Sequence, residues 1–153
     1  VKIVKNKDEL NAEFQELIKT AKRKNLPLEG ILVQEFISGQ ELIIGIKKDP
    51  TFNHVIVFGL GGIFTEILKD ISIRKCPINS HDADEMFSEI KSRVILQGVR
   101  GKKLNLLLLK QTLINISKIP LKYKNISELD INPFILNEKT GKAADVRIVF
   151  DEK

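Results

Sequence analysis

The most constraining feature of the sequence is a series of short apolar runs, separated by turn residues, that begins near Gly30. Ser38-Gly39 and Asp49-Pro50 lie between successive runs, and connections this short place neighbouring strands in antiparallel order. The pattern therefore predicts an antiparallel sheet. Its expected strands are residues 31–37, 41–47, 55–58 and 67–74.

Helical periodicity in three further segments predicts helices that pack on this sheet. Asn6 followed by Glu9 has the spacing of a capping box, and apolar side chains then recur on one helical face. Ser80 and Asn105 are the expected N-caps of two later helices, and the second helix extends to about residue 119. Alternation of apolar and polar residues predicts a short strand over residues 1–5, and three further strands are expected over residues 128–132, 134–137 and 143–150. The expected fold class is α+β, with a largely antiparallel sheet and packed helices.

Composition excludes several classes of protein. The 25 Lys and Arg residues exceed the 20 Asp and Glu residues, which gives a net charge of +5. The lysines are scattered among acidic residues rather than clustered, which disfavours a nucleic-acid-binding surface. Cys76 is the single cysteine, so an intrachain disulfide or a cysteine zinc cluster is impossible. No apolar run approaches the length of a membrane span, so no membrane partner is expected.

Two expectations concern the protein as a whole. No signal peptide opens the chain, which predicts a cytoplasmic location. The chain begins with Val1 rather than with methionine, which suggests a fragment or a processed chain.

The first candidate site is formed by Asp130, Asn132 and Asp145. Asp130 and Asn132 are two residues apart in a predicted strand, so their side chains lie on the same face. A hairpin turn predicted over residues 138–141 returns Asp145 to the neighbouring strand beside them. Two carboxylates and an amide oxygen suit a hard cation such as Mg²⁺, which takes its remaining ligands from water and phosphates. Taken alone, the pattern is also typical of the solvated face of a half-exposed strand.

Two further patterns are compatible with nucleotide binding. The segment Gly59-Leu60-Gly61-Gly62, followed by Glu66 and Asp70, could let backbone N–H groups approach a phosphate. It matches neither a Walker loop nor a dinucleotide fingerprint, so taken alone it is better explained by a strained turn. Residues 33–41 could hold adenine along the strand backbone and ribose at the Glu41 carboxylate, although an ordinary hairpin has the same pattern.

The order of these three patterns along the chain resembles the ATP-grasp fold. The closest resemblance is to the nucleotide-binding (β) part of NDP-forming acyl-CoA synthetases, of the acetate–CoA ligase (ADP-forming) type. It is carried by GILVQEFISGQELIIGIKKDPTFNHVIVFGLGGIFTEILKD, ILQGVRGKK and ELDINPFIL, and it covers essentially the whole chain. The resemblance implies that residues 1–29 end the N-terminal ATP-grasp lobe and that residues 30–153 form the C-terminal lobe.

The resemblance also implies which residues bind the nucleotide. Gln34, Glu35 and Ile37 would lie on the hinge strand that holds adenine, and Glu41 would bind the ribose. A glycine-containing segment that faces the active cleft is matched by Gly61, Gly62 and Glu66, of which Glu66 is a catalytic candidate.

For the metal and the phosphoryl group, the resemblance implies a second set of residues. Asn132 and Asp145 match Mg²⁺ ligands of the related succinyl-CoA synthetases, and Asp130 matches a metal-site carboxylate. Arg74 and Arg147 are the cationic candidates for phosphoryl contact, and Arg74 is also a catalytic candidate.

The reaction implied by the resemblance converts acyl-CoA, phosphate and ADP reversibly into acid, CoA and ATP through a phosphohistidine. The implied cofactors are ATP or ADP and Mg²⁺. Neither His54 nor His81 lies in a segment like that around the family's phosphate-accepting histidine. That histidine and the missing N-terminal lobe are therefore expected to precede Val1. The expected partner is the CoA-binding α subunit or domain of the same synthetase.

Two other functions fit parts of the pattern. A succinyl-CoA-ligase-like β subunit would share the Mg²⁺ ligands. A non-catalytic nucleotide-binding regulatory module would keep Gln34 and Glu41 but would not need the metal ligands. Because Asp130, Asn132 and Asp145 are all present, the sequence favours the enzyme.

Overall fold

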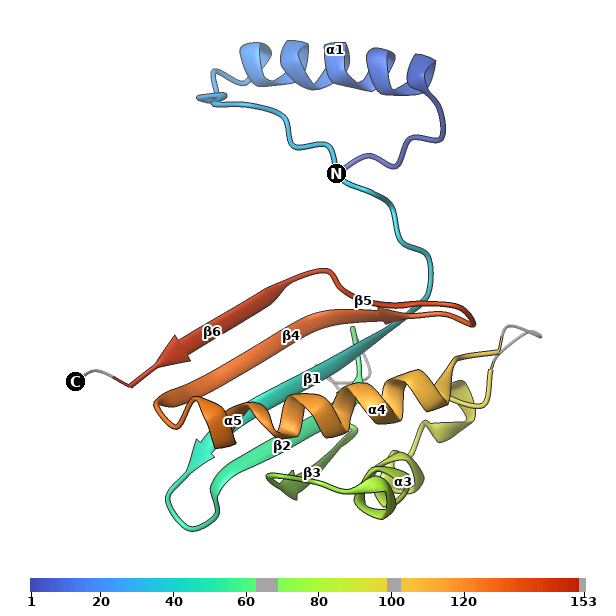
Figure 1. Cartoon of the computed structure of the whole chain (residues 1–153). Helices are drawn as coiled ribbons and strands as arrows, with labels where there is room; N and C mark the ends of the chain where they lie inside the picture. The colour runs from blue at the N-terminus through green and yellow to red at the C-terminus, as the bar shows by residue number, and fades with distance from the viewer. Residues whose placement is uncertain (63–68, 99–102, 152–153) are drawn as a thin grey trace. The chain divides into compact units, whose positions relative to one another are not determined.

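The computed structural model describes residues 1–62, 69–98 and 103–151. The chain divides into two compact units, Val1–Phe36 and Ile37–Lys153 (Figure 1). Within the described ranges, no helix has both the length and the apolar character that a membrane span requires.

The first unit contains one helix, α1 (Lys7–Arg23). Its N-cap is Asn6, whose Oδ1 accepts a hydrogen bond from the Glu9 N–H at 2.9 Å. The Glu9 carboxylate accepts in return from the Lys5 N–H at 2.9 Å. The predicted helix and its cap are therefore confirmed, with the reciprocal contact displaced by one residue.

The strands predicted over residues 1–5 and 31–37 are wrong. Neither segment joins a ladder with any other described part of the chain. Alternation decides which way side chains point, but a strand also needs a neighbour that satisfies its N–H and C=O groups. The hairpin expected across Ser38-Gly39 is therefore not formed.

The second unit is built on a six-stranded sheet in which every pairing is antiparallel. The path through the sheet is β3-β2-β1-β4-β5, and β6 also pairs with β4. The strands are β1 (Gln40–Asp49), β2 (Asn53–Leu60), β3 (Ile71–Lys75), β4 (Ile126–Leu136), β5 (Gly141–Ala143) and β6 (Val146–Phe150). The α+β class with a largely antiparallel sheet is confirmed.

The hairpin between β1 and β2 forms at the predicted turn. The Asp49 carboxylate accepts from the N–H groups of Thr51 and Phe52, both at 2.8 Å, which is how short polar side chains stabilise tight turns. At the other end of β1, Gly39 passes so close to β4 that a Cβ there would lie 2.5 Å from the Leu136 carbonyl oxygen. Only glycine lets the chain enter β1 at this point.

Strand β4 is one strand where the sequence predicted two. Between the pairs Leu42–Phe134 and Ile44–Ile131, two residues of β4, Asn132 and Pro133, oppose one residue of β1. A bulge of this kind accommodates a proline inside a sheet. The strand predicted over residues 143–150 is correspondingly broken into β5 and β6 beside this bulge.

The helices of the second unit are α3 (Ser80–Glu89), the 3₁₀ helix η1 (Arg93–Ile95), α4 (Leu106–Ser117) and α5 (Ile119–Lys122). The N-cap of α3 is Asn79 rather than the predicted Ser80. Asn79 Oδ1 accepts from the His81 and Asp82 N–H groups, and the Asp82 carboxylate accepts from the Asn79 N–H, which completes a capping box. The predicted cap of α4 is confirmed, because Asn105 Oδ1 accepts from the Leu108 N–H at 3.0 Å.

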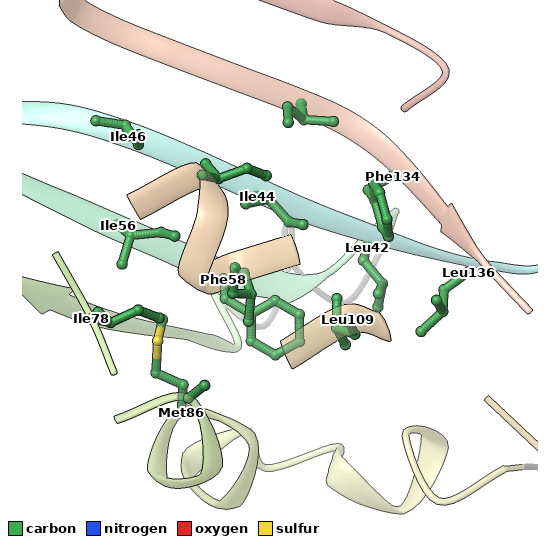
Figure 2. Packing of buried hydrophobic residues seen from close by; sticks show 14 of the residues in the cluster. Leu42, Ile44, Ile46, Ile56, Phe58, Ile78, Met86, Leu109, Phe134 and Leu136 are labelled. Carbon is green, nitrogen blue, oxygen red and sulfur yellow. The ribbon is translucent and has the colours of Figure 1, made fainter. Parts of the chain in front are cut away.

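One hydrophobic core fills the space between the sheet and helices α3 and α4. Figure 2 shows Ile44 and Phe58 of the sheet directed toward the side that Met86 of α3 and Leu109 of α4 occupy. Phe58 also contacts Phe87 edge to face, with ring centroids 5.4 Å apart. Burying one such side chain contributes about 1.5–3 kcal/mol, so this face of the sheet is fixed by packing.

The opposite side of the sheet, here called the outer face, is turned away from α3 and α4. On β1 the buried residues Leu42, Ile44 and Ile46 alternate with residues of the outer face, among them Glu41 and Gly45. The outer face is where the predicted polar residues of β4 lie.

Candidate functional site

Strand β4 places Asp130 and Asn132 on the outer face. They alternate with Leu129 and Ile131, which are buried against the core. Asp130 is half-buried and Asn132 is exposed. The alternation of burial along β4 shows that these two side chains lie on one face, as the sequence predicts.

The break between β5 and β6 brings Asp145 next to Asn132. The Asn132 N–H donates to the Asp145 carbonyl at 3.2 Å, and the Ala144 N–H donates to the Pro133 carbonyl at 3.0 Å. These two bonds connect the bulge of β4 to the break in the neighbouring chain segment. Asp130, Asn132 and Asp145 therefore lie together, and this group is called the oxygen trio below.

The oxygen trio has the chemistry of a site for a hard cation. Its donors are two carboxylates and an amide oxygen, and Mg²⁺ binds oxygen ligands of this kind. With the other described residues, none of the three side chains makes a hydrogen bond or an ion pair. Over the same ranges, no group of three His, Cys, Asp or Glu side chains is arranged to hold a metal ion, and the oxygen trio contains only two carboxylates.

Glu41 and Gly61 meet at the start of β1. The Gly61 N–H donates to the Glu41 carbonyl at 2.8 Å, and a Cβ on Gly61 would lie 3.0–3.1 Å from three atoms of Glu41. A side chain at position 61 would therefore displace the Glu41 backbone. Gly62 follows with a φ of 65°, a conformation that favours glycine. The structure thus joins the start of the predicted glycine segment to the predicted ribose carboxylate, whose side chain is exposed.

Glu41 of β1 and Asp130 and Asn132 of β4 lie on the same face at a defined separation. Gly45 is the register partner of Asp130, and it is four residues from Glu41 on β1. At about 3.3 Å per residue, the separation along the strand is roughly 13 Å. The half-buried Ile43 lies between them on this face, and Gly45 adds no side chain beside Asp130.

Arg147 also lies with the oxygen trio. It is on β6 as the register partner of Asp130, and its guanidinium donates to the Glu128 carboxylate of β4. Glu128 was not among the predicted site residues. The sequence contains a pattern that could have identified it, because Glu128, Asp130 and Asn132 follow one another with the period of two that strands show.

Arg74 does not lie with this group. On β3 it is the register partner of Ile56, which is buried, so its side chain points toward the helices. Its guanidinium pairs with Glu89 and Glu85 of α3, with 2.9 Å between Nη1 and Glu89 Oε2. The hydrogen bond that Arg74 donates to Glu89 raises the pKa of Arg74, and the hydrogen bonds donated by Arg74 and Ser72 lower the pKa of Glu89. Arg74 stabilises the packing of α3, and we leave it out of the site proposed below.

Asp70 is a buried carboxylate that secures the chain after the glycine segment. Its two oxygens accept from the N–H groups of Lys91 and Ser92 at 2.7 and 2.8 Å. Burial raises the pKa of Asp70, but these hydrogen bonds outweigh it and the pKa lies below its usual value. Asp70 therefore holds the start of β3 against the residues that follow α3.

The remaining predicted residues are not brought together by the structure. Gln34 and Glu35 belong to the first unit, and Ile37 belongs to the second, where it precedes β1. Glu66 lies outside the described residues. The roles of these four residues stay predictions.

A pocket of about 500 Å³ lies near the end of β4, but it is separate from the oxygen trio. Its lining includes Gln40, Leu104, Leu136 and Lys139. Gln40 and Leu136 alternate with the outer-face positions of their strands, so the pocket is on the helix side. The candidate site is a surface of the sheet rather than this pocket.

Comparisons with known proteins identify the family. A family model described as an ATP-grasp domain matches residues 1–150. Acetate–CoA ligase [ADP-forming] of Methanocaldococcus jannaschii is 44% identical over 148 residues, which are 89% of this chain and 21% of that protein. The beta subunit of acetate–CoA ligase [ADP-forming] I of Pyrococcus furiosus is 38% identical over 150 residues, which are 95% of this chain and 65% of that subunit. The chain thus spans between about a fifth and two thirds of the length of these relatives.

A solved structure with the same fold has a nucleotide bound. It is the dinucleotide forming acetyl-coenzyme A synthetase 1 of Ca. Korarchaeum cryptofilum, in complex with coenzyme A and Mg-AMPPCP. The TM-score is 0.77 at 33% identity, over 99% of this chain and 75% of that chain. In that structure the phosphohistidine segment points towards the nucleotide binding site. The resemblance expected from the sequence is confirmed, and the chain belongs to the ATP-grasp domain family.

Proposed function

We propose that this chain is the nucleotide-binding part of an ADP-forming acyl-CoA synthetase and that its outer face binds Mg²⁺ and ATP or ADP. The observation that carries the proposal is that Glu41, Asp130 and Asn132 lie on one face of one sheet, with the Asp145 carbonyl accepting from the Asn132 N–H. Glu41 and the register partner of Asp130 are four residues apart on β1, a separation of roughly 13 Å along the strand. A nucleotide can therefore lie along the sheet, with its ribose at Glu41 and its phosphates at Asp130.

Each residue of this face has a role in the proposal. Glu41 accepts hydrogen bonds from the ribose hydroxyls, and Gly61 and Gly62 let the backbone approach the phosphates. The oxygen trio holds Mg²⁺, which when bound neutralises charge on the phosphate oxygens. Arg147 contacts the phosphoryl group. For Gln34, Glu35 and Ile37, the role of holding adenine rests on the family resemblance alone.

Phosphoryl transfer requires positioning and charge stabilisation more than covalent chemistry from the protein. A sheet surface with fixed side chains supplies both, because its donors need no reorganisation when charge develops. The phosphoryl group passes between a histidine nitrogen and the terminal phosphate oxygen of ADP. Neither His54 nor His81 is suited to that role: His54 is buried with Nε2 bonded to the Ile126 carbonyl, and His81 is on α3.

The remainder of the reaction requires protein segments beyond this sequence. We propose that the phosphate-accepting histidine and a CoA-binding subunit or domain complete the enzyme. The names of the relatives support this, since one is a beta subunit and another is a longer single chain. The overall reaction is the reversible conversion of acyl-CoA, phosphate and ADP into acid, CoA and ATP.

The experiment that tests the proposal removes two donors of the oxygen trio. Asn132→Ala combined with Asp145→Ala should weaken Mg²⁺-dependent binding of AMPPCP to the complete enzyme by more than about a hundredfold, since even indirect partners of a metal site cost about 10–100-fold. Calorimetry in Mg²⁺ and in EDTA measures the loss.

A matched control makes the same chemical changes on the helix side of the sheet. Asn115→Ala combined with Asp84→Ala alters two exposed residues of α4 and α3, and it should leave the affinity for Mg-AMPPCP unchanged. Equal affinities in the two double variants would show that the oxygen trio does not hold the metal.

A further inference from the structure

Strand β4 presents three polar side chains in succession to the outer face: Glu128, Asp130 and Asn132. Arg147 of β6 lies directly opposite Asp130 in the register. Its guanidinium nevertheless donates to Glu128, one position along the same face. Arg147 therefore pairs with Glu128 and not with Asp130, its register partner on β4.

An ion pair between Arg147 and Asp130 would be sterically possible. Directly opposed residues of antiparallel strands have Cβ atoms about 4.5–5.5 Å apart, and opposite charges in such positions attract. The planar guanidinium can pair with either carboxylate in the same forked manner. With Arg147 on Glu128, the Asp130 carboxylate is without a hydrogen-bond or ion-pair partner in the described part of the chain.

We infer that Glu128 is a positioning residue that holds the Arg147 guanidinium off Asp130 and so keeps the Asp130 carboxylate available to a divalent cation. The inference rests on the proposed function in one respect, the assignment of Asp130 to the metal site. Glu128 itself touches neither metal nor nucleotide in this account.

The charges around Glu128 are consistent with this role. Lys47 of β1 is its register partner on the other side, so Glu128 lies between two cations on the outer face. Asp130 has Gly45 as its register partner on β1, which adds no cation there. Glu128 is thus the carboxylate that neutralises cations, whereas Asp130 has Arg147 as its single cationic register partner.

Removing the Glu128 charge should transfer Arg147 to Asp130. The test is Glu128→Gln in the full chain, with Mn²⁺ alone as the probe and free Mn²⁺ counted by electron paramagnetic resonance. We expect about threefold to fivefold weaker Mn²⁺ binding, the range that an exposed ion pair can supply. Glu138→Gln is the matched control, because it removes the same charge from an exposed residue of the β4–β5 turn and should leave binding unchanged.

A second variant separates the proposed role from a general loss of negative charge. If Arg147 is the competitor, Glu128→Gln combined with Arg147→Gln should bind Mn²⁺ as tightly as Arg147→Gln alone. A threefold to fivefold loss that persists in this double variant would overturn the inference.

The crystal structure of the Glu128→Gln variant provides a readout that does not depend on metal. We expect the Arg147 guanidinium within hydrogen-bond distance of the Asp130 carboxylate. A guanidinium that remains away from Asp130 would overturn the inference, even if the wild-type chain binds Mn²⁺. A wild-type chain that binds no Mn²⁺, together with a transferred guanidinium, would instead overturn the metal site and leave the Glu128–Arg147 relation intact.

Discussion

On strand β1, Leu42, Ile44 and Ile46 are buried under the helices, whereas Glu41 and Gly45 of the same strand lie on the outer face. Both sets of residues share one backbone and one ladder of hydrogen bonds. The helix side is therefore constrained by volume, because closely packed side chains have no room to change size. The outer face carries no such constraint within this unit.

The polar side chains of the two faces also differ in how far they find partners within the protein. On the helix side Arg74 and Glu89 form an ion pair that is complete within the protein. On the outer face Arg147 and Glu128 also form a pair, but Asp130 and Asn132 there, and the adjacent Asp145, have no side-chain partner among the residues that the structure describes. Polar groups satisfied internally stabilise a fold, and a cluster of unsatisfied ones on a rigid sheet is suited to bind a ligand.

The largest expected effect distinguishes the two faces by stability. Phe58→Ala should lower the free energy of unfolding by about 3–5 kcal/mol, because it leaves a cavity in a close-packed core. Ile73→Ala, at a residue of β3 that is 48% exposed, should cost about 1 kcal/mol or less. Urea denaturation measures both. Similar costs at the two positions would contradict the distinction between the faces.

A smaller effect is expected from the buried carboxylate on the helix side. Asp70→Asn should cost about 1–3 kcal/mol at pH 7, because two backbone N–H groups lose a charged acceptor. The pKa of Asp70 is lowered by folding, so its stabilising effect is complete above the unfolded pKa of about 3.9 and is lost as the pH falls through the folded value. The difference between wild type and variant should therefore shrink below about pH 4. Urea unfolding across this range measures it, and a difference that stays constant down to pH 2 would be inconsistent with a charged Asp70.

The smallest effect on stability sharpens the contrast between two arginines. Arg74→Met should lower stability by about 1 kcal/mol or less, since its partner Glu89 is half-exposed and solvent screens the pair. It should leave the affinity for Mg-AMPPCP unchanged. Arg147→Met should instead cause little loss of stability and should weaken the binding of Mg-AMPPCP. Thermal unfolding and calorimetry on both variants decide the matter, and a loss of nucleotide affinity in Arg74→Met alone would exchange the two roles.

Local patterns predicted much of the fold. Strands β1 and β2, their turn at Asp49-Pro50, and the caps Asn6 and Asn105 all depend on residues close together in the sequence. The strand predicted over residues 31–37 failed because an apolar run says nothing about a partner for its backbone. Strand pairing depends on distant segments, and a single run of residues cannot reveal it.

The orientation of β3 could not be predicted from its own residues. Its isoleucines, Ile71 and Ile73, lie on the outer face, whereas Ser72 and Arg74 point toward the helices. Apolar residues would ordinarily be assigned to the core. Here Glu89 of α3 supplies a partner for both polar side chains, and that contact is visible only once the helix has been placed.

The candidate site could also be predicted in part from residues that are close together in the sequence. The spacing of Asp130 and Asn132 fixes their common face, and the following hairpin brings back Asp145, although through a break between two strands rather than along one. The pairing of Arg147 with Glu128 depends on the register between β4 and β6, which changes at the irregularity near Ile126. A shift of one residue would have moved Arg147 to the other face.

The most direct test of the central claim is a crystal structure of the complete enzyme with Mn²⁺ and AMPPCP. We expect an anomalous Mn²⁺ peak bound by oxygens of Asp130, Asn132 and Asp145, with the ribose at Glu41 and the phosphates over the outer face between them. A metal held elsewhere, or a nucleotide seated in the pocket beside Gln40 on the helix side, would contradict it.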